Sequence, residues 1–352
     1  MPTRKSSDSR PQITEVFPAA AIPGGEFQLR GNSLTSDAPP VACFGDVPAR
    51  VVIGSESFMI VRVPEGASRG ELTLGLERAR GTVAPATGDS YDWQCDIGVQ
   101  IADGIHPVAN PVVDAIGNIY TTLSGTAGQR TPVSVYKLDT NLQLKPFVSD
   151  ILNATGLALD PTGVLYVSSR RDGIVYQISA TGTATSFVEG MGVATGIVFD
   201  QAGNLYVGDR SGTIFKISPD RQIYVFATLE PSMAAYHLAF SPDNYLYVTG
   251  PTTSSFDVVR RISPDGQVDV FYRGLGRPQG LTFDTAGNLY VSSSLAGRRG
   301  VARITPDGKA ELFLSGPSIV GVAFASPRTF VVATNSALYR VQLREHLTTK
   351  PK

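Results

Sequence analysis

The sequence predicts an all-β protein with two domains, a small β-sandwich followed by a six-bladed β-propeller. One template recurs from residue 110 onward at intervals of 40 to 46 residues, which is the period of four-stranded propeller blades. The 36 glycines and 24 prolines among 352 residues suit many short strands joined by tight turns. No stretch carries the apolar spacing of a long amphipathic helix.

Composition excludes several classes of protein. A chain of 352 residues with 42% hydrophobic residues has enough apolar surface for a sizeable core. Thirty basic and 31 acidic residues leave a net charge of −1, so the overall charge predicts no nucleic-acid partner. No apolar run approaches the roughly 18 residues that a membrane-spanning helix requires, and we therefore expect no transmembrane segment.

The N-terminus and the cysteines carry few signals. A basic start without an apolar stretch behind it is not a signal peptide. We therefore expect a cytoplasmic protein by default, and an extracellular one if the true start lies upstream. Cys43 and Cys95 allow either one disulfide or two free thiols, and the sequence leaves both open. We also expect a monomer.

The repeats combine a short apolar strand, an Asp-x-x-Gly turn and a Leu-Tyr-Val strand. Asp-x-x-Gly closes the first hairpin of a blade, and Pro-Asp-Gly at 264–266 and 306–308 closes the last one. The copies span 110–120, 156–167, 196–207, 237–248 and 280–291, and a degenerate sixth begins at 321. The turn residue that anchors each copy is Asp114, Asp160, Asp200, Ser241, Asp284 and Ala325 in turn. These anchors are interpreted as turn residues rather than as catalytic groups.

The sixth copy lacks an outer strand, because the chain has only one more strand after residue 332. Residues 96–105 align with residues 145–151, the outer strand and loop of the first copy. Residues 97–102 are therefore expected to complete the last blade and close the ring, which removes its open sheet edges.

Two resemblances follow from these motifs. Gly-Asn-Leu-Tyr-Val and the strand after it, over 203–220, are similar to the NHL-repeat and gluconolactonase-like propellers, and this likeness covers residues 96–342. Such propellers host hydrolases, lyases and binding modules, so the fold does not specify the activity. Short alternating strands over 11–93 indicate a sandwich and resemble the immunoglobulin-like IPT/TIG domains, which in bacteria serve as spacers or binding modules. The expected domains are a flexible N-terminus (1–10), the IPT/TIG-like sandwich (11–94), the propeller (95–342) and a C-terminal tail (343–352).

Propeller topology places the loops between blades, and those between second and third strands, on one face. The residue immediately before the first residue of each copy lies at the mouth of the central channel on that face. In gluconolactonase-like propellers these positions hold a divalent cation through carboxylates and amides. Here they are Ala109, Thr155, Thr195, Tyr236, Gln279 and Val320. None is a carboxylate, so we expect no metal site and no cofactor; a cation such as calcium belongs only to a hydrolase interpretation.

His237 is the unusual titratable residue of the mouth. It replaces the glycine that begins most copies and follows Tyr236 directly. His237 and Tyr236 are the candidate catalytic residues. The alternative is a packed histidine in the core. His346 lies in the charged tail and is expected to be solvated.

Charged residues form a rim around the mouth. The loops between blades carry Asp103, Asp150, Glu189 and Glu230 at nearly equivalent positions, with Arg273 in the fifth. The loops between second and third strands carry arginines, and no stacking aromatics accompany them, which disfavours nucleic acid. Ordinary solvated loops are the alternative interpretation.

The sequence therefore favours a non-enzymatic binding or scaffold protein that recognises a protein or polysaccharide through the mouth face. The alternative is a divergent gluconolactonase-like hydrolase around His237, Tyr236 and Gln279, aided by the rim acids Glu189 and Glu230. A third possibility is a structural surface protein that acts only as a rigid platform. The candidate ligand-binding residues are Thr155, Thr195, Tyr236, His237, Gln279, Arg170, Arg171, Asp209, Arg210, Glu189 and Glu230.

Overall fold

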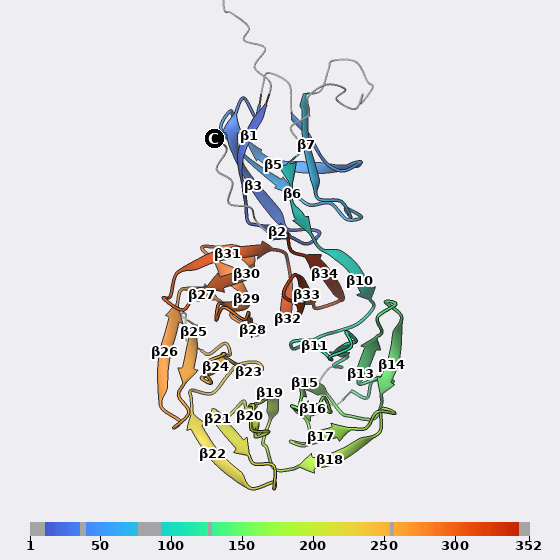
Figure 1. The fold of residues 1–352 in the computed structure, drawn as a ribbon, viewed down its shortest axis with the longest axis vertical. Helices are drawn as coiled ribbons and strands as arrows, with labels where there is room; N and C mark the ends of the chain where they lie inside the picture. The colour runs from blue at the N-terminus through green and yellow to red at the C-terminus, as the bar shows by residue number, and fades with distance from the viewer. Residues whose placement is uncertain (1–10, 36–39, 77–92, 126–128, 254–256, 345–352) are drawn as a thin grey trace, which may run out of the picture. The chain divides into compact units, whose positions relative to one another are not determined.

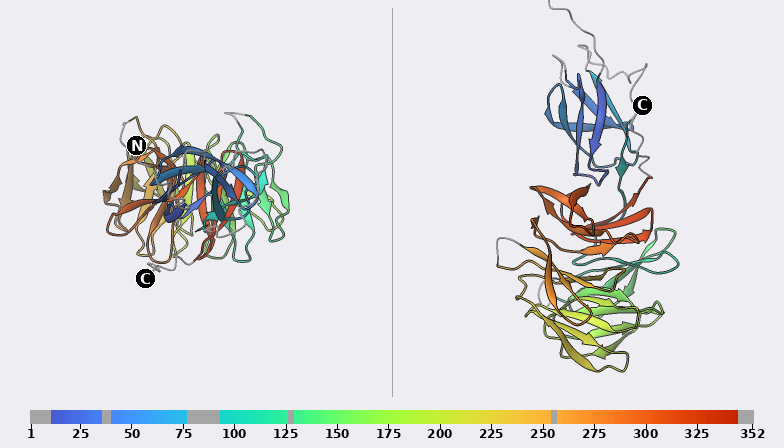
Figure 2. Two further views of the ribbon diagram at one scale, coloured as in Figure 1. Left: turned by 90° about the horizontal axis from the view of Figure 1, so that it is seen from above. Right: turned by 60° about the vertical axis from the view of Figure 1, so that its left-hand side comes forward.

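The computed structural model describes residues 11–35, 40–76, 93–125, 129–253 and 257–344. Within these ranges the chain forms strands, turns and loops without a helix, as Figures 1 and 2 show. The predicted all-β class is confirmed. No helix that could span a membrane occurs in this described part of the chain. The predicted flexible N-terminus (1–10) and His346 with the tail from 345 lie outside the described residues.

The chain divides into two compact units. Unit 1 comprises Met1–Val99, Phe313–Pro317 and Val341–Lys352, and unit 2 comprises Gln100–Leu312 and Ser318–Arg340. The N-terminal strands of unit 1 are β1 (Gln12–Phe17), β2 (Ala20–Ala21), β3 (Glu26–Asn32), β4 (Pro40–Phe44), β5 (Val47–Gly54), β6 (Phe58–Arg62), β7 (Glu71–Leu76), β8 (Trp93–Gln94) and β9 (Asp96–Ile97).

Seven strands of unit 1 form one hydrogen-bonded path in the order β1-β3-β6-β5-β4-β7-β8. The first residues of β5 pair with β4 and its later residues pair with β6, so β5 connects the two halves of the path. Phe27 of β3 and Phe44 of β4 are fully buried, with ring centroids 5.7 Å apart, and share one core. Cys43 and Cys95 are free thiols.

Unit 2 is a propeller-like arrangement of small antiparallel sheets (Figure 1). Four of its sheets run in chain order, with the first strand innermost and the fourth outermost in the figure. They are β11 (Val112–Val113), β12 (Ile119–Thr122), β13 (Val135–Leu138) and β14 (Leu144–Val148); β15 (Ala154–Leu159), β16 (Leu165–Ser169), β17 (Val175–Ile178) and β18 (Ala184–Val188); β19 (Ala194–Phe199), β20 (Leu205–Asp209), β21 (Thr213–Ile217) and β22 (Ile223–Thr228); and β23 (His237–Phe240), β24 (Leu246–Thr249), β25 (Val258–Ile262) and β26 (Val268–Arg273).

The last repeat is completed by a strand from the N-terminal side, as predicted. The sheet runs β10-β34-β33-β32 and comprises β10 (Val99–Asp103), β32 (Ile319–Ser326), β33 (Thr329–Thr334) and β34 (Ala337–Gln342). The expected bounds of 97–102 are corrected at the start. Asp96 and Ile97 pair with β2 as β9, and the Gly98 amide donates to the Ala21 carbonyl at 2.8 Å, so the closing strand begins at Val99.

The sequence predicts six separate four-stranded sheets, whereas the described residues form five. The remaining strands are β27 (Leu275–Gly276), β28 (Leu281–Phe283), β29 (Leu289–Leu295), β30 (Arg298–Ile304) and β31 (Ala310–Ser315). They belong to a larger sheet, because β2 pairs in parallel with the end of β31 at Leu314 and Ser315, which are residues of unit 1.

Aromatic contacts join neighbouring sheets of unit 2. Tyr206 of β20 lies 5.0 Å, between ring centroids, from Phe226 in its own sheet and 5.0 Å from Phe240 in the next. Both contacts are edge-to-face, the geometry that aromatic quadrupoles favour by about 0.5–1.5 kcal/mol per pair. Tyr166 and Tyr247 repeat both contacts, and Tyr290 repeats the contact with the next sheet through Phe324. In four repeats the tyrosine therefore joins its sheet to the next one.

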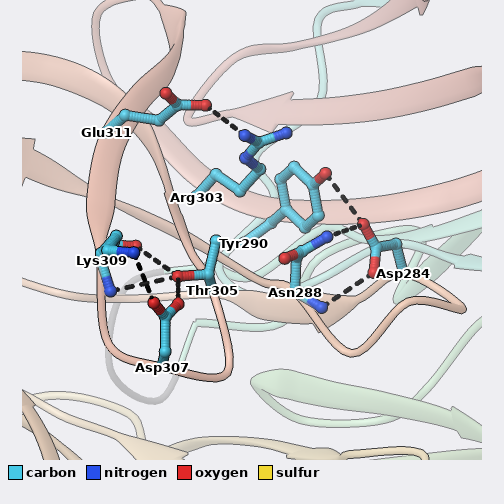
Figure 3. Close-up of polar contacts among 8 residues, drawn as sticks. All are labelled: Asp284, Asn288, Tyr290, Arg303, Thr305, Asp307, Lys309 and Glu311. Atoms are coloured by element: carbon cyan, nitrogen blue, oxygen red, sulfur yellow. Dashed lines mark hydrogen bonds and ion pairs between the residues drawn. The ribbon is translucent and has the colours of Figure 1, made fainter.

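The anchor aspartates are turn residues, as predicted. One carboxylate oxygen of Asp284 accepts the backbone N–H of Asn288 at 2.8 Å (Figure 3). The other accepts the Asn288 side-chain amide at 2.8 Å and the Tyr290 hydroxyl at 3.1 Å. Asp114 and Asp200 make the same set of bonds. These carboxylates are engaged by donors of their own hairpins.

The innermost strands approach one another at glycines. A Cβ atom on Gly196 would lie 2.4 Å from the Tyr236 carbonyl oxygen, and one on Gly156 would lie 2.3 Å from the Thr195 carbonyl oxygen. No real side chain fits at such distances, so glycine is required there. Asn110 also links inner strands, since its amide donates to the Leu281 carbonyl at 2.7 Å and its oxygen accepts the Val322 N–H at 3.0 Å.

We predict that Asn110→Ala lowers the free energy of unfolding by about 2–4 kcal/mol, because it leaves a carbonyl of β28 and an amide of β32 without this partner. Urea unfolding measures the change. Asn141→Ala, in an exposed turn, is the matched control and is expected to leave stability unchanged. Equal stabilities of the two variants would contradict a linking role for Asn110.

Candidate functional site

A pocket of about 300 Å³ lies in unit 2 between the β19–β22 and β23–β26 sheets. It is lined by the loop between β22 and β23, the loop after β24, and strands β25 and β26. The polar and glycine residues of its lining include Glu230, Tyr236, Gly250, Thr252, Arg260 and Arg273. Its volume lies at the lower end of the range for small-molecule sites.

The loops around the pocket are joined by hydrogen bonds. The Ser232 hydroxyl donates to the Pro251 carbonyl at 3.0 Å, and the Met233 N–H donates to the same oxygen at 2.7 Å. A loop between sheets thus meets a loop between a second and a third strand. This is the juxtaposition that propeller topology predicts for the mouth face.

Tyr236 forms a wall of the pocket and is 3% exposed. Its hydroxyl donates to the Glu230 carbonyl, and its N–H donates to the Thr195 hydroxyl at 3.1 Å. Burial raises the pKa of Tyr236 to about 12, a shift that Asp209 and Glu230 favour and Arg260 opposes. The phenol therefore stays protonated at neutral pH.

Gly250 makes room for the Tyr236 ring. A Cβ atom on Gly250 would lie 2.6 Å from Cδ1 of Tyr236, so any larger residue must displace the ring. Glycine at this position therefore maintains the shape of the pocket wall.

The lining carries more positive than negative charge. Arg260 Nη2 lies 3.5 Å from Glu230 Oε2, with 23% of the arginine side chain and 66% of the glutamate side chain exposed. Arg273, at the end of β26, is exposed, and no ion pair of its guanidinium occurs among the described residues. Two arginines against one glutamate leave one positive charge in the lining.

His237 lies apart from this chemistry. It is 4% exposed, begins β23 and is not in the pocket lining. Burial lowers its pKa from 6.5 to about 4. The imidazole is therefore neutral at physiological pH and only weakly basic, which makes it a poor general base.

The two threonines of the mouth use their hydroxyls internally. The Thr155 hydroxyl donates to the Asn153 carbonyl and the Thr195 hydroxyl to the Gly208 carbonyl, both at 2.8 Å. The Gln279 backbone pairs with Ser292 and Thr249. These groups do not fit a divalent cation, because hydroxyls bound to carbonyls and neutral oxygens lack the charge that such an ion requires. In the described ranges, no cluster of three or more His, Cys, Asp or Glu residues is placed to hold a metal ion.

Seven of the predicted ligand-binding residues separate into three groups. Glu230 and Tyr236 line the pocket. Arg170 donates to the Gly125 carbonyl at 3.1 Å, and buried Asp209 accepts the Val193 N–H at 2.8 Å, so both have structural partners. Outside the pocket lie the exposed residues Arg171, Glu189 and Arg210.

The sequence did not predict Arg260, Gly250 and Thr252 as residues of the site. Arg260 nevertheless carried a signal, because three earlier repeats place an aromatic residue at the equivalent position of the third strand, namely Tyr136, Tyr176 and Phe215. Arg273 was noted only as a basic residue at an otherwise acidic rim position. Both arginines are thus departures from the repeat, and the structure brings them to one pocket.

Comparisons with known proteins give a structural likeness. No family model matches the chain, and no curated protein matches it. An auxiliary nutrient binding protein from Bacteroides thetaiotaomicron VPI-5482 is similar, with a TM-score of 0.58 and 13% identity over 95% of this chain and 98% of its own. A gluconolactonase from Xanthomonas campestris has a TM-score of 0.61 and 18% identity over 71% and 90%. Virginiamycin B lyase from Staphylococcus aureus has a TM-score of 0.51 and 12% identity over 91% and 100%.

The chain shares its fold with gluconolactonase-like β-propellers. At identities of 12–18% the likeness shows the fold alone. The predicted propeller resemblance is confirmed at that level.

We predict that His237→Gln flattens the dependence of stability on acid pH. The folded pKa of His237 is about 4 and its ordinary value is 6.5, so its contribution is complete above pH 6.5 and is lost as the pH falls toward 4. The loss in the wild type is on the order of 3 kcal/mol. Urea unfolding at several pH values between these limits measures it.

Asn141→Ala is the control, because Asn141 lies in an exposed turn and carries no titratable group, so its replacement should leave the pH dependence unchanged. A His237→Gln profile as steep as that of the wild type would refute the burial of a neutral imidazole.

Proposed function

We propose that this chain is a non-enzymatic binding protein that recognises a polysaccharide or protein ligand on the mouth face of its propeller. The observation that carries this proposal is the polar pocket between the loops around Tyr236, with its lining of Arg260, Arg273 and Glu230. Such a concave site with a few convergent polar groups is typical of ligand recognition. The likeness to an auxiliary nutrient binding protein over nearly the whole of both chains supports it.

Two features of the architecture are also proposals. We interpret β28–β31 as a sixth blade, since these antiparallel strands repeat the pattern of the five separate sheets. We interpret residues 11–94 as an immunoglobulin-like sandwich of the IPT/TIG type, which acts as a spacer or second contact. The shared core of Phe27 and Phe44 supports two packed layers. The propeller is assigned to residues 95–342.

A divergent lactone hydrolase is the second candidate, favoured by the likeness to a gluconolactonase. Its proposed residues are His237, Tyr236 and Gln279 with Glu189 and Glu230. Several observations weigh against it: His237 is a weak base outside the pocket, and the Tyr236 hydroxyl is already donated to a backbone carbonyl. Binding therefore accounts better for the geometry.

We predict that Gly250→Ala weakens ligand binding on the order of tenfold, because its Cβ atom displaces the Tyr236 ring, which forms a wall of the pocket. Binding of the full chain to a panel of immobilised neutral and acidic polysaccharides identifies a ligand, and titration calorimetry then compares the variants. Gly75→Ala is the matched control, since nothing lies within 4 Å of its new Cβ atom.

A folding defect in Gly250→Ala would be detected by circular dichroism. Glu230→Gln then serves as the second variant, since 66% of the Glu230 side chain is exposed and the substitution should preserve the fold. Unchanged affinity in both variants would overturn recognition at this pocket.

For the hydrolase candidate, we predict that aliphatic lactones are not turned over above the background rate. Turnover that His237→Gln and Tyr236→Phe abolish, while circular dichroism stays unchanged, would establish the hydrolase instead. Turnover that survives both substitutions would exclude these residues as its catalytic groups.

A further inference from the structure

Two basic departures from the repeat converge on the pocket beside Tyr236. At the rim position where the preceding repeats carry Asp103, Asp150, Glu189 and Glu230, the fifth carries Arg273. On the third strand, Arg260 takes a position that is aromatic in three earlier repeats. Arginine therefore stands in place of an acid and of an aromatic residue at one pocket, which favours the binding of an anion there.

We propose that this pocket binds a uronic acid residue of an acidic polysaccharide, with Arg273 and Arg260 holding its carboxylate and Glu230 accepting its ring hydroxyls. The proposal deepens the binding function above and rests on it. Arginine suits this role because its planar guanidinium donates two parallel hydrogen bonds to a carboxylate.

The pocket electrostatics support one negative charge on the ligand. The lining has two arginines and one glutamate, so a monoanion neutralises it. Arg260 already contacts Glu230 at 3.5 Å, while the guanidinium of Arg273 has no ion pair among the residues described. Arg273 is thus the cation most available to a ligand. A phosphate dianion would leave the pocket with one net negative charge, whereas a monoanion leaves it neutral.

The polar lining favours a sugar over an acidic peptide side chain. Glu230 and Thr252 place an acceptor and a hydroxyl near the arginines. A uronic acid carries hydroxyl donors on the same ring as its carboxylate, so it can satisfy both groups at once. An aspartate or glutamate side chain offers the carboxylate alone and brings no hydroxyl donor for Glu230.

The test is a calorimetric titration of the full chain with short oligogalacturonates and oligoglucuronates, with their methyl esters, and with neutral galactans. We expect binding of a uronate and loss of that binding on methyl esterification, which removes the charge and keeps the ring hydroxyls. Arg273→Met should weaken the uronate affinity about tenfold or more. Arg299→Met, an exposed arginine of the β29–β30 hairpin outside the pocket, should not change it.

Three outcomes would overturn the acidic sugar. The first is equal affinity for the acid and its methyl ester. The second is that inorganic phosphate or an oligoglutamate peptide displaces the bound uronate at a lower concentration than free uronate does. The third is that neither uronate series binds. The proposed function is judged separately. Binding of a neutral glycan or a protein that Gly250→Ala weakens would keep the function and reject the acidic sugar, whereas insensitivity of every ligand to Gly250→Ala would reject both.

Circular dichroism checks that Arg273→Met is folded. Arg273→Lys is the conservative variant, which keeps the charge and loses the forked geometry. Partial recovery of affinity in Arg273→Lys relative to Arg273→Met is expected if the charge itself contributes. No difference between lysine and methionine, with both equal to wild type, would reject a role for Arg273.

Discussion

The edge-to-face contact between a second-strand tyrosine and two phenylalanines is the interaction on which unit 2 depends. Tyr206 bridges Phe226 in its own sheet and Phe240 in the next, and its hydroxyl also donates to Asp200. One side chain thus couples a turn, a sheet and the neighbouring sheet. Because the same contact recurs in four repeats, the tyrosine joins successive sheets in the same way.

The close approach of the inner strands has a consequence for the site. Gly156 and Gly196 lie against carbonyl groups of the next strand, and the hydroxyls of Thr155 and Thr195 are donated to backbone carbonyls. These two hydroxyls are therefore occupied by the fold itself. The pocket beside Tyr236 instead offers the charged groups of Arg260, Arg273 and Glu230.

Much of the fold follows from the local sequence, because a strand, a turn and a period are local patterns. The Asp-x-x-Gly turns, the tyrosine of each repeat and the closing strand were all predictable from alternation and spacing. The parallel pairing of β2 with β31 was not, since Ala20 and Leu314 are distant in sequence and two-residue strands have no periodicity. This pairing explains why only five sheets are separate.

The candidate site was predicted less completely, for a related reason. Topology predicted the face, and the residue types predicted Glu230 and Tyr236 as participants. The sequence did not show which charges meet, because the contact of Arg260 with Glu230 joins β25 to a loop of the preceding connection. Nor did it show that Tyr236 requires Gly250, a constraint visible only in three dimensions.

Repetition itself explains why the pocket lies where it does. In a repeat protein, residues that hold the sheets together must recur in every copy, and a residue that serves one ligand has no reason to recur. His237 and Arg273 both break the pattern of their positions, but His237 is buried as a neutral ring whereas Arg273 is exposed at the pocket. Departure from the repeat is therefore informative only together with exposure and a cavity. Arg273 meets both conditions and the partly buried Arg260 lines the same cavity, which is why the charge of this one pocket, rather than the titratable histidine, supports the proposed function.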